Sequence, residues 1–161
     1  MRNWWIPLLA ALVVACGGKS AADYDREARA ALDAGDLPKA IKVVEEGLAC
    51  DAVKQDAAAA WRLEQTRLEA LAKNGKGAEV KSELDRLATA YPKQVSASLY
   101  RSLADKAKEA GDTTGAIDVL TAGDQRFPAE HASFVEAINA LKASGTLDPD
   151  QVQRLKALGY L

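Results

Sequence analysis

Hydrophobic positions along the chain recur at the three- and four-residue spacing of amphipathic helices. Around Gly111, one apolar stripe precedes the glycine and a second follows it: Leu99, Leu103, Ala104 and Ala107, then Ala116, Ile117, Leu120 and Gly123. A glycine can adopt the left-handed conformation that ends a helix, and Asp112 is placed to cap the next one. Pro128 cannot continue that second helix. The pattern therefore predicts two helices joined at Gly111.

This pattern occurs three times without internal gaps, in segments 24–51, 64–92 and 100–128. Thirty-six residues separate Gly75 from Gly111, whereas forty separate Gly35 from Gly75, so extra residues lie between the first two segments. A single unit of this kind cannot bury its apolar side alone, and stacked neighbours share a continuous core. The chain is therefore predicted to be an all-α array of helical hairpins, with an irregular helical bundle as the alternative.

The unit resembles the tetratricopeptide repeat, in which a Gly-Asp pair joins two helices. A small residue lies five positions after the glycine, and a proline lies seventeen after it. The matching positions are Gly35, Asp36 and Ala40 in the first unit, Gly75, Val80 and Pro92 in the second, and Gly111, Asp112, Ala116 and Pro128 in the third. The early aromatic position and the small position four residues later hold Tyr24 and Ala28, and Tyr100 and Ala104. The second unit departs from the pattern with Glu64 and Leu68, with Trp61 as a substitute aromatic, and the first unit lacks the final proline. The resemblance covers about 120 residues and implies a short α-solenoid.

Two further helices are predicted after the third unit. Segment 130–143 is amphipathic, with an apolar side made of Phe134, Val135, Ile138 and Leu141, and is expected to cap the array. Asp148 and Pro149 suit the start of a last short helix. Its apolar side chains, with the tyrosine that follows them, are Val152, Leu155, Leu158 and Tyr160. This tail either packs against the array or docks Leu155, Leu158 and Tyr160 into a partner's groove.

The N-terminal segment has the pattern of an export signal. Arg2 is followed by an apolar run of eleven residues, 4–14, which is too short for a membrane-spanning helix of about twenty residues and suits a signal peptide. Residues 13–16 (VVAC) resemble the lipobox of bacterial lipoproteins, in which the cysteine receives diacylglycerol. The resemblance implies lipidation of Cys16 and a location in the cell envelope, with Gly17 favouring the outer membrane, facing the periplasm. An ordinary secretory signal and an uncleaved anchor are the alternatives.

Four parts are therefore expected along the chain. They are a signal peptide at 1–15, a lipidated flexible tether at 16–22, tetratricopeptide-like repeats with the capping helix at 23–143, and the C-terminal helix or tail at 144–161.

Composition and motifs argue against catalysis and nucleic-acid binding. A net charge of −2 provides no concentrated positive field, and the single histidine, His131, has no companions for a metal site. Residues 17–20 (GGKS) lack the upstream glycine of a phosphate-binding loop, because Val13 stands there. With Cys16 lipidated, Cys50 is expected to be a small buried residue, a disulfide within the chain being excluded; a reactive thiol or an intermolecular bridge is the alternative. We expect that the protein is not an enzyme and that it has no small-molecule substrate and no cofactor beyond the lipid.

In the tetratricopeptide family, the first helices of successive units line a concave groove that binds peptides or partner helices. The corresponding positions here are Asp25, Arg29, Arg62, Gln65, Glu69, Arg101, Asp105 and Lys108. They do not reproduce the Lys/Asn set with which some members clamp a C-terminal carboxylate. Arginines among acids favour a charged peptide or protein surface. The resemblance thus implies a membrane-anchored interaction scaffold or assembly factor that binds another envelope protein. A pilot, targeting or accessory-subunit lipoprotein acting through its tail is the alternative.

Overall fold

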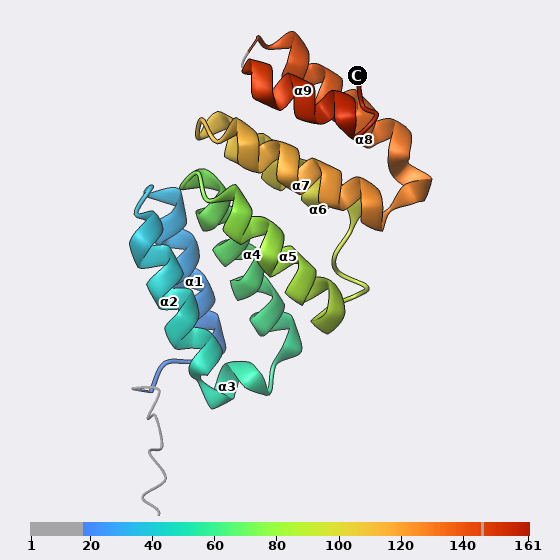
Figure 1. The fold of residues 1–161 in the computed structure, drawn as a ribbon. Coiled ribbons are helices and arrows are strands. Elements are labelled where there is room, and N and C mark those ends of the chain that lie inside the picture. The colour runs from blue at the N-terminus through green and yellow to red at the C-terminus, as the bar shows by residue number, and fades with distance from the viewer. Residues whose placement is uncertain (1–17, 146) are drawn as a thin grey trace, which may run out of the picture.

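The computed structural model describes residues 18–145 and 147–161, and within them the chain is all-helical with no strand (Figure 1). The predicted signal peptide and Cys16 lie outside the described residues. The described elements are α1 (Ala21–Asp33), α2 (Leu37–Ala49), α3 (Asp51–Lys54), α4 (Ala57–Lys73), α5 (Gly77–Ala90), α6 (Ala97–Glu109), α7 (Thr113–Arg126), the 3₁₀ turn η1 (Pro128–Glu130), α8 (His131–Ala143) and α9 (Pro149–Ala157). The predicted all-α class is confirmed.

The helices follow one another as pairs that lie in successive layers, from α1–α2 at one end to α8–α9 at the other (Figure 1). Helix α4 contacts α1, and α6 contacts α4, so the first helices of successive pairs are neighbours. Helix α7 contacts α5 in the same way. The short helix α3 occupies part of the longer spacing between the first two units.

Each pair turns at a glycine with positive φ: Gly35 at 76°, Gly75 at 66°, Gly111 at 85° and Gly145 at 68°. At the third turn, the N–H of Gly111 donates to the Lys108 carbonyl and that of Asp112 to the Ala107 carbonyl, each at 2.9 Å. These bonds satisfy carbonyls that the end of a helix leaves without partners. The sequence predicted this ending at the first three glycines. Because Gly145 ends α8 in the same conformation, α8 and α9 form a fourth pair.

Buried aromatic rings also indicate that α8 and α9 are equivalent to the earlier pairs. Phe134 stands eleven residues before Gly145, as Tyr100 stands eleven before Gly111, and both rings are fully buried. Both pack against Gly123 of α7, where an added Cβ atom would lie 2.6 Å from Phe134 Cε1 and 2.9 Å from Tyr100 Cβ. Because Gly123 has no side chain, the rings of Tyr100 and Phe134, from two successive pairs, can both pack closely against α7.

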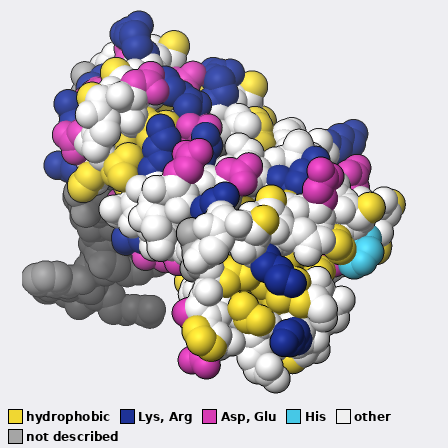
Figure 2. Space-filling model, turned by 90° about the horizontal axis from the view of Figure 1, so that it is seen from above, with side chains coloured by type: hydrophobic (Ala, Val, Ile, Leu, Met, Phe, Trp, Pro, Cys, Tyr) yellow, Lys and Arg dark blue, Asp and Glu magenta, His cyan; other side chains and the backbone are white. Residues whose placement is uncertain are grey.

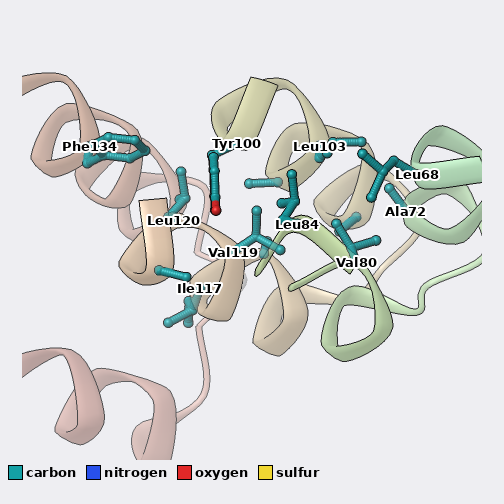
Figure 3. Packing of buried hydrophobic residues seen from close by; sticks show 14 of the residues in the cluster. Leu68, Ala72, Val80, Leu84, Tyr100, Leu103, Ile117, Val119, Leu120 and Phe134 are labelled. Atoms are coloured by element: carbon teal, nitrogen blue, oxygen red, sulfur yellow. The ribbon is translucent and has the colours of Figure 1, made fainter. Parts of the chain in front are cut away.

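The main core runs from the second pair to the fourth. Its side chains come from α4 to α9, and Figure 3 shows Leu84, Val119 and Leu120 converging around Tyr100. Leu155 of α9 belongs to the same cluster and is fully buried. Two smaller clusters of buried side chains join α1, α2 and α4. The last helix is thus part of the main core.

Candidate functional site

The predicted binding residues all lie on first helices: two on α1, three on α4 and three on α6. We call this set the first-helix face: Asp25, Arg29, Arg62, Gln65, Glu69, Arg101, Asp105 and Lys108. Because α4 contacts both α1 and α6, it links the residues of all three helices. These side chains fall into three groups that differ in their partners.

Between α1 and α4, four of the predicted residues pair with one another. Arg62 Nε donates to Asp25 Oδ2 at 2.7 Å, and Arg29 Nη1 donates to Glu69 Oε2 at 3.0 Å. Both arginines are partly exposed, so each ion pair adds only about 0.2–1 kcal/mol to stability. The more important effect is that two long, flexible side chains are oriented by carboxylates on the neighbouring helix.

A hollow lies beside these pairs. It has a volume of about 280 Å³ and is lined by Ala22, Asp25, Arg26, Arg29 and Arg62. Three arginine side chains therefore line this space together with one aspartate. The sequence interpretation did not include Arg26, although its place three residues before Arg29 puts both on one side of a helix.

The predicted residues between α4 and α6 have no internal side-chain partner among the described residues. Gln65, Asp105 and Lys108 make no side-chain hydrogen bond or ion pair with any residue in the described part of the chain. Asp105 is exposed, and the other two are half-buried. Their hydrogen-bonding groups face solvent and can accept a ligand without breaking an internal contact.

Between α6 and α8, Arg101 is held in place. Its Nη1 donates to Ser133 Oγ at 2.6 Å and lies 3.6 Å from Glu130 Oε2. The guanidinium also lies 5.6 Å from the centre of the Phe134 ring, a distance that permits a cation–π interaction. Arg101 therefore joins the third and fourth pairs as well as contributing charge to this face.

The C-terminal tail packs against the array. Leu155 is 0% exposed, whereas Leu158 is 46% exposed. The Tyr160 hydroxyl donates to Asp124 Oδ2 at 2.6 Å, and burial together with this bond raises the pKa of Tyr160 to about 12. His131, on the exposed side of the same site, places Nδ1 2.9 Å from Asp124 Oδ1. Of the three residues considered for docking, Leu158 is exposed, Tyr160 is half-buried and Leu155 is buried.

The unusual Glu64 of the second unit takes part in a charged network between α4 and α5. It is 5% exposed, and Arg86 Nη2 donates to its Oε1 at 2.7 Å. Arg86 Nε also donates to Glu83 Oε2 at 2.8 Å, and Arg67 Nη2 lies 3.3 Å from Glu83 Oε1. This buried carboxylate has an opposite charge nearby to offset its desolvation.

The structure corrects the expectation for Cys50. Its side chain is buried, as predicted, but it is disulfide-bonded, so the exclusion of a disulfide was wrong. The exclusion assumed that lipid occupies Cys16, the only other cysteine in the sequence. Cys16 lies outside the described residues.

Three observations complete the description of the surface. No group of His, Cys, Asp or Glu side chains within residues 18–145 and 147–161 could hold a metal ion. None of the helices described is long and apolar enough to cross a bilayer. Figure 2, seen from the α8–α9 end, shows basic and acidic side chains interspersed, and hydrophobic side chains gathered on part of this end.

Comparisons with protein-family models, curated proteins and solved structures find no match to this chain.

Proposed function

We propose that the chain is a non-catalytic protein-interaction module, a short tetratricopeptide-like array held at a membrane of the bacterial cell envelope by a lipid on Cys16. The glycine turns support the array, because four successive helix pairs share one turn conformation. Contacts between equivalent helices support it too. Arg62 bonds Asp25 thirty-seven residues away, and Gln151 bonds Thr114 across the same separation. Contacts of this kind between equivalent helices are expected where one unit stacks on the next.

The observation that carries the binding function is the first-helix face. Arg29 and Arg62 are oriented there by neighbouring carboxylates, while Gln65, Asp105 and Lys108 have no partner among the described residues. Polar groups of both signs that remain unpaired on a rigid scaffold suit a charged segment of another protein, because complementary charges select the partner and its orientation. The partner is thus a protein or peptide of an envelope complex.

Charge reversal at Asp105 tests this binding surface. Partners are captured by cross-linking in cells and identified by mass spectrometry, first with the unchanged chain. Asp105→Lys should reduce recovery of the specific partner about tenfold, since it reverses a charge in the face without breaking an internal bond. Glu45→Lys makes the same charge change on α2, at an exposed site outside the face, and should leave recovery unchanged. Equal recovery from both variants, with circular dichroism showing intact helices, would reject the proposed face.

The anchor is tested separately through both cysteines. Cys16→Ala should move the protein from the membrane pellet to the soluble periplasmic fraction, whereas Cys50→Ser should leave it in the pellet. The anchored chain, extracted in detergent without reductant, should show the added mass of the lipid. If Cys16→Ala still sediments with membranes after a high-salt wash, the lipid is not the anchor. We place the protein at the outer membrane, facing the periplasm, because Gly17 follows the lipidated cysteine.

The tail-based alternative has narrower support. A pilot, targeting or accessory role through the tail would depend on Leu158, since Leu155 is buried and Tyr160 bonds Asp124. Docking of the whole tail would require α9 to leave the core. The first-helix face can bind without such a rearrangement.

A further inference from the structure

We propose that the hollow between α1 and α4 binds a carboxylate group of the partner, so that the partner contacts this end of the array with an acidic segment. We call the site the arginine hollow and define it by Ala22, Asp25, Arg26, Arg29 and Arg62. This inference rests on the proposed function, because it specifies the chemistry of the segment that the first-helix face binds. It adds Arg26, which lies outside the set predicted from the sequence.

Each of the three guanidinium groups bonds a carboxylate, but this bond does not use all of its N–H donors. Arg62 uses Nε to bond Asp25, Arg29 uses Nη1 to bond Glu69, and Arg26 uses Nη2 to bond Asp23. A guanidinium has five N–H donors, and these bonds occupy one atom of each. The remaining donors leave hydrogen-bonding capacity for a ligand while the ion pairs stay intact. Orientation before binding reduces the entropy lost when the ligand arrives.

The lining favours an oxyanion with the geometry of a carboxylate. Three positive side chains and one negative side chain face a space of about 280 Å³, and Ala22 contributes only a methyl group. The planar fork of arginine matches the two oxygens of a carboxylate, and such charge-assisted bonds are stronger than neutral ones. Arg29 and Arg62 come from different helices, so a carboxylate between them would bridge the first two pairs of the array.

The charges around the hollow favour an acidic protein segment over an anionic membrane. Asp23, Glu27 and Glu69 lie next to the arginines or pair with neighbouring cations. Pairing with these acids limits the positive charge of the hollow to short range. Attraction to anionic lipids is long-ranged and requires a cluster of unpaired basic residues. Recognition here instead operates at hydrogen-bond distance, where a single ligand carboxylate meets several donors.

The test uses the full lipidated chain in uncharged detergent and a fluorescent hexaglutamate peptide that is acetylated and amidated at its ends. Binding is followed by fluorescence anisotropy. Arg29→Gln and Arg62→Gln should each weaken binding about tenfold. Arg154→Gln is the matched control, because Arg154 is also a half-exposed arginine that bonds an aspartate on a neighbouring helix, and it should leave binding unchanged. Asp25→Asn should tighten binding several-fold, since the amide oxygen still accepts from Arg62 while the competing negative charge is gone.

Equal affinities for Arg62→Gln and Arg154→Gln would overturn the assignment. So would an Asp25→Asn variant that binds more weakly, because that result would make Asp25 part of the ligand site. An alanine peptide with a free C-terminus and inorganic phosphate are competitors. Displacement of hexaglutamate by the alanine peptide at equal concentration would overturn the acidic segment, because a terminal carboxylate would then suffice. Displacement by phosphate alone would overturn the carboxylate assignment.

The last measurement is binding of the chain to vesicles that contain phosphatidylglycerol. Binding to these vesicles that depends on Arg62, without binding of the peptide, would assign the hollow to lipid and overturn the proposal. Failure here is distinguishable from failure of the proposed function. If hexaglutamate does not bind but Asp105→Lys still loses the cross-linked partner, only the arginine hollow is rejected.

Discussion

At the residue scale, one position explains why the second pair looks irregular in sequence. Eleven residues before the turn glycine, the other pairs carry an aromatic ring, whereas the second carries Glu64. Twelve residues after the turn, the first and third pairs carry Gly47 and Gly123, whereas the second carries Leu87. A leucine here leaves less room for a ring, and the smaller carboxylate of Glu64 is accommodated by Arg86. The two departures therefore compensate for each other within one unit.

Tyr160 gives a prediction at the same scale. Its pKa is raised from the ordinary value of 10.0 to about 12 by burial and by the bond to Asp124, so folding favours the neutral phenol. The stability that this bond provides is fully present below pH 10 and is lost as the pH rises through 12. Absorbance of tyrosinate should show one group with a midpoint near 12 that disappears in Tyr160→Phe. A titration of Tyr160 near pH 10 would contradict the packed tail.

At the element scale, the second unit lacks the aspartate that caps second helices in its neighbours. Lys76 precedes α5 and makes no side-chain cap. The third unit supplies the cap: Asp112 accepts from Gly115 N at 2.8 Å through Oδ1 and from Gly77 N at 2.7 Å through Oδ2. The two helix starts can approach because both residues are glycines; an added Cβ on Gly77 would lie 2.3 Å from the Cα of Gly115. One carboxylate thus serves two helices.

Asp112→Ala should therefore cost more stability than Asp36→Ala. Asp36 caps α2 alone, through Lys39 N at 3.2 Å, and the loss of one such cap costs about 1 kcal/mol. Loss of Asp112 removes two caps and should lower the free energy of unfolding by roughly 2 kcal/mol. Urea unfolding of both variants measures the difference. Equal losses would mean that the bond to Gly77 contributes nothing.

At the scale of the whole molecule, the C-terminal helix belongs to the array. Its side chains bond along α7: Gln151 to Thr114, and Arg154 to Asp118. Leu155 of the same helix is buried in the main core. The sequence divides this region into a capping helix and a separate tail, but these side chains attach the tail helix to α7 and to the main core.

Substitutions of two leucines, Leu155 in α9 and Leu158 directly after it, test whether this packing supports the fold. Leu155→Ala should lower the free energy of unfolding by about 2–5 kcal/mol, the usual cost of truncating a buried leucine. Leu158→Ala removes the same atoms from a side chain that is 46% exposed and should change stability by less than about 0.5 kcal/mol. Thermal and urea unfolding report both. A free docking tail would instead make the two variants equally harmless to stability.

The sequence by itself determined the local features of this protein. Helical periodicity, the glycine turns and the capping residues depend on side chains within a few positions of one another, so they can be predicted without the fold. The assignment of Arg29, Arg62 and Asp105 to one set of first helices follows from the same periodicity and the repeat. These features were enough to predict the all-α class and the turns at Gly35, Gly75 and Gly111.

Only the tertiary structure decided which of these groups meet. Arg62 pairs with Asp25, Asp112 reaches Gly77, and Tyr160 reaches Asp124 across separations of thirty-five to thirty-seven residues. Such contacts depend on how one pair stacks on the next, and hydrophobic periodicity specifies a buried side but not that register. The arginine hollow is a product of the stacking, because its lining comes from two helices that the sequence places far apart.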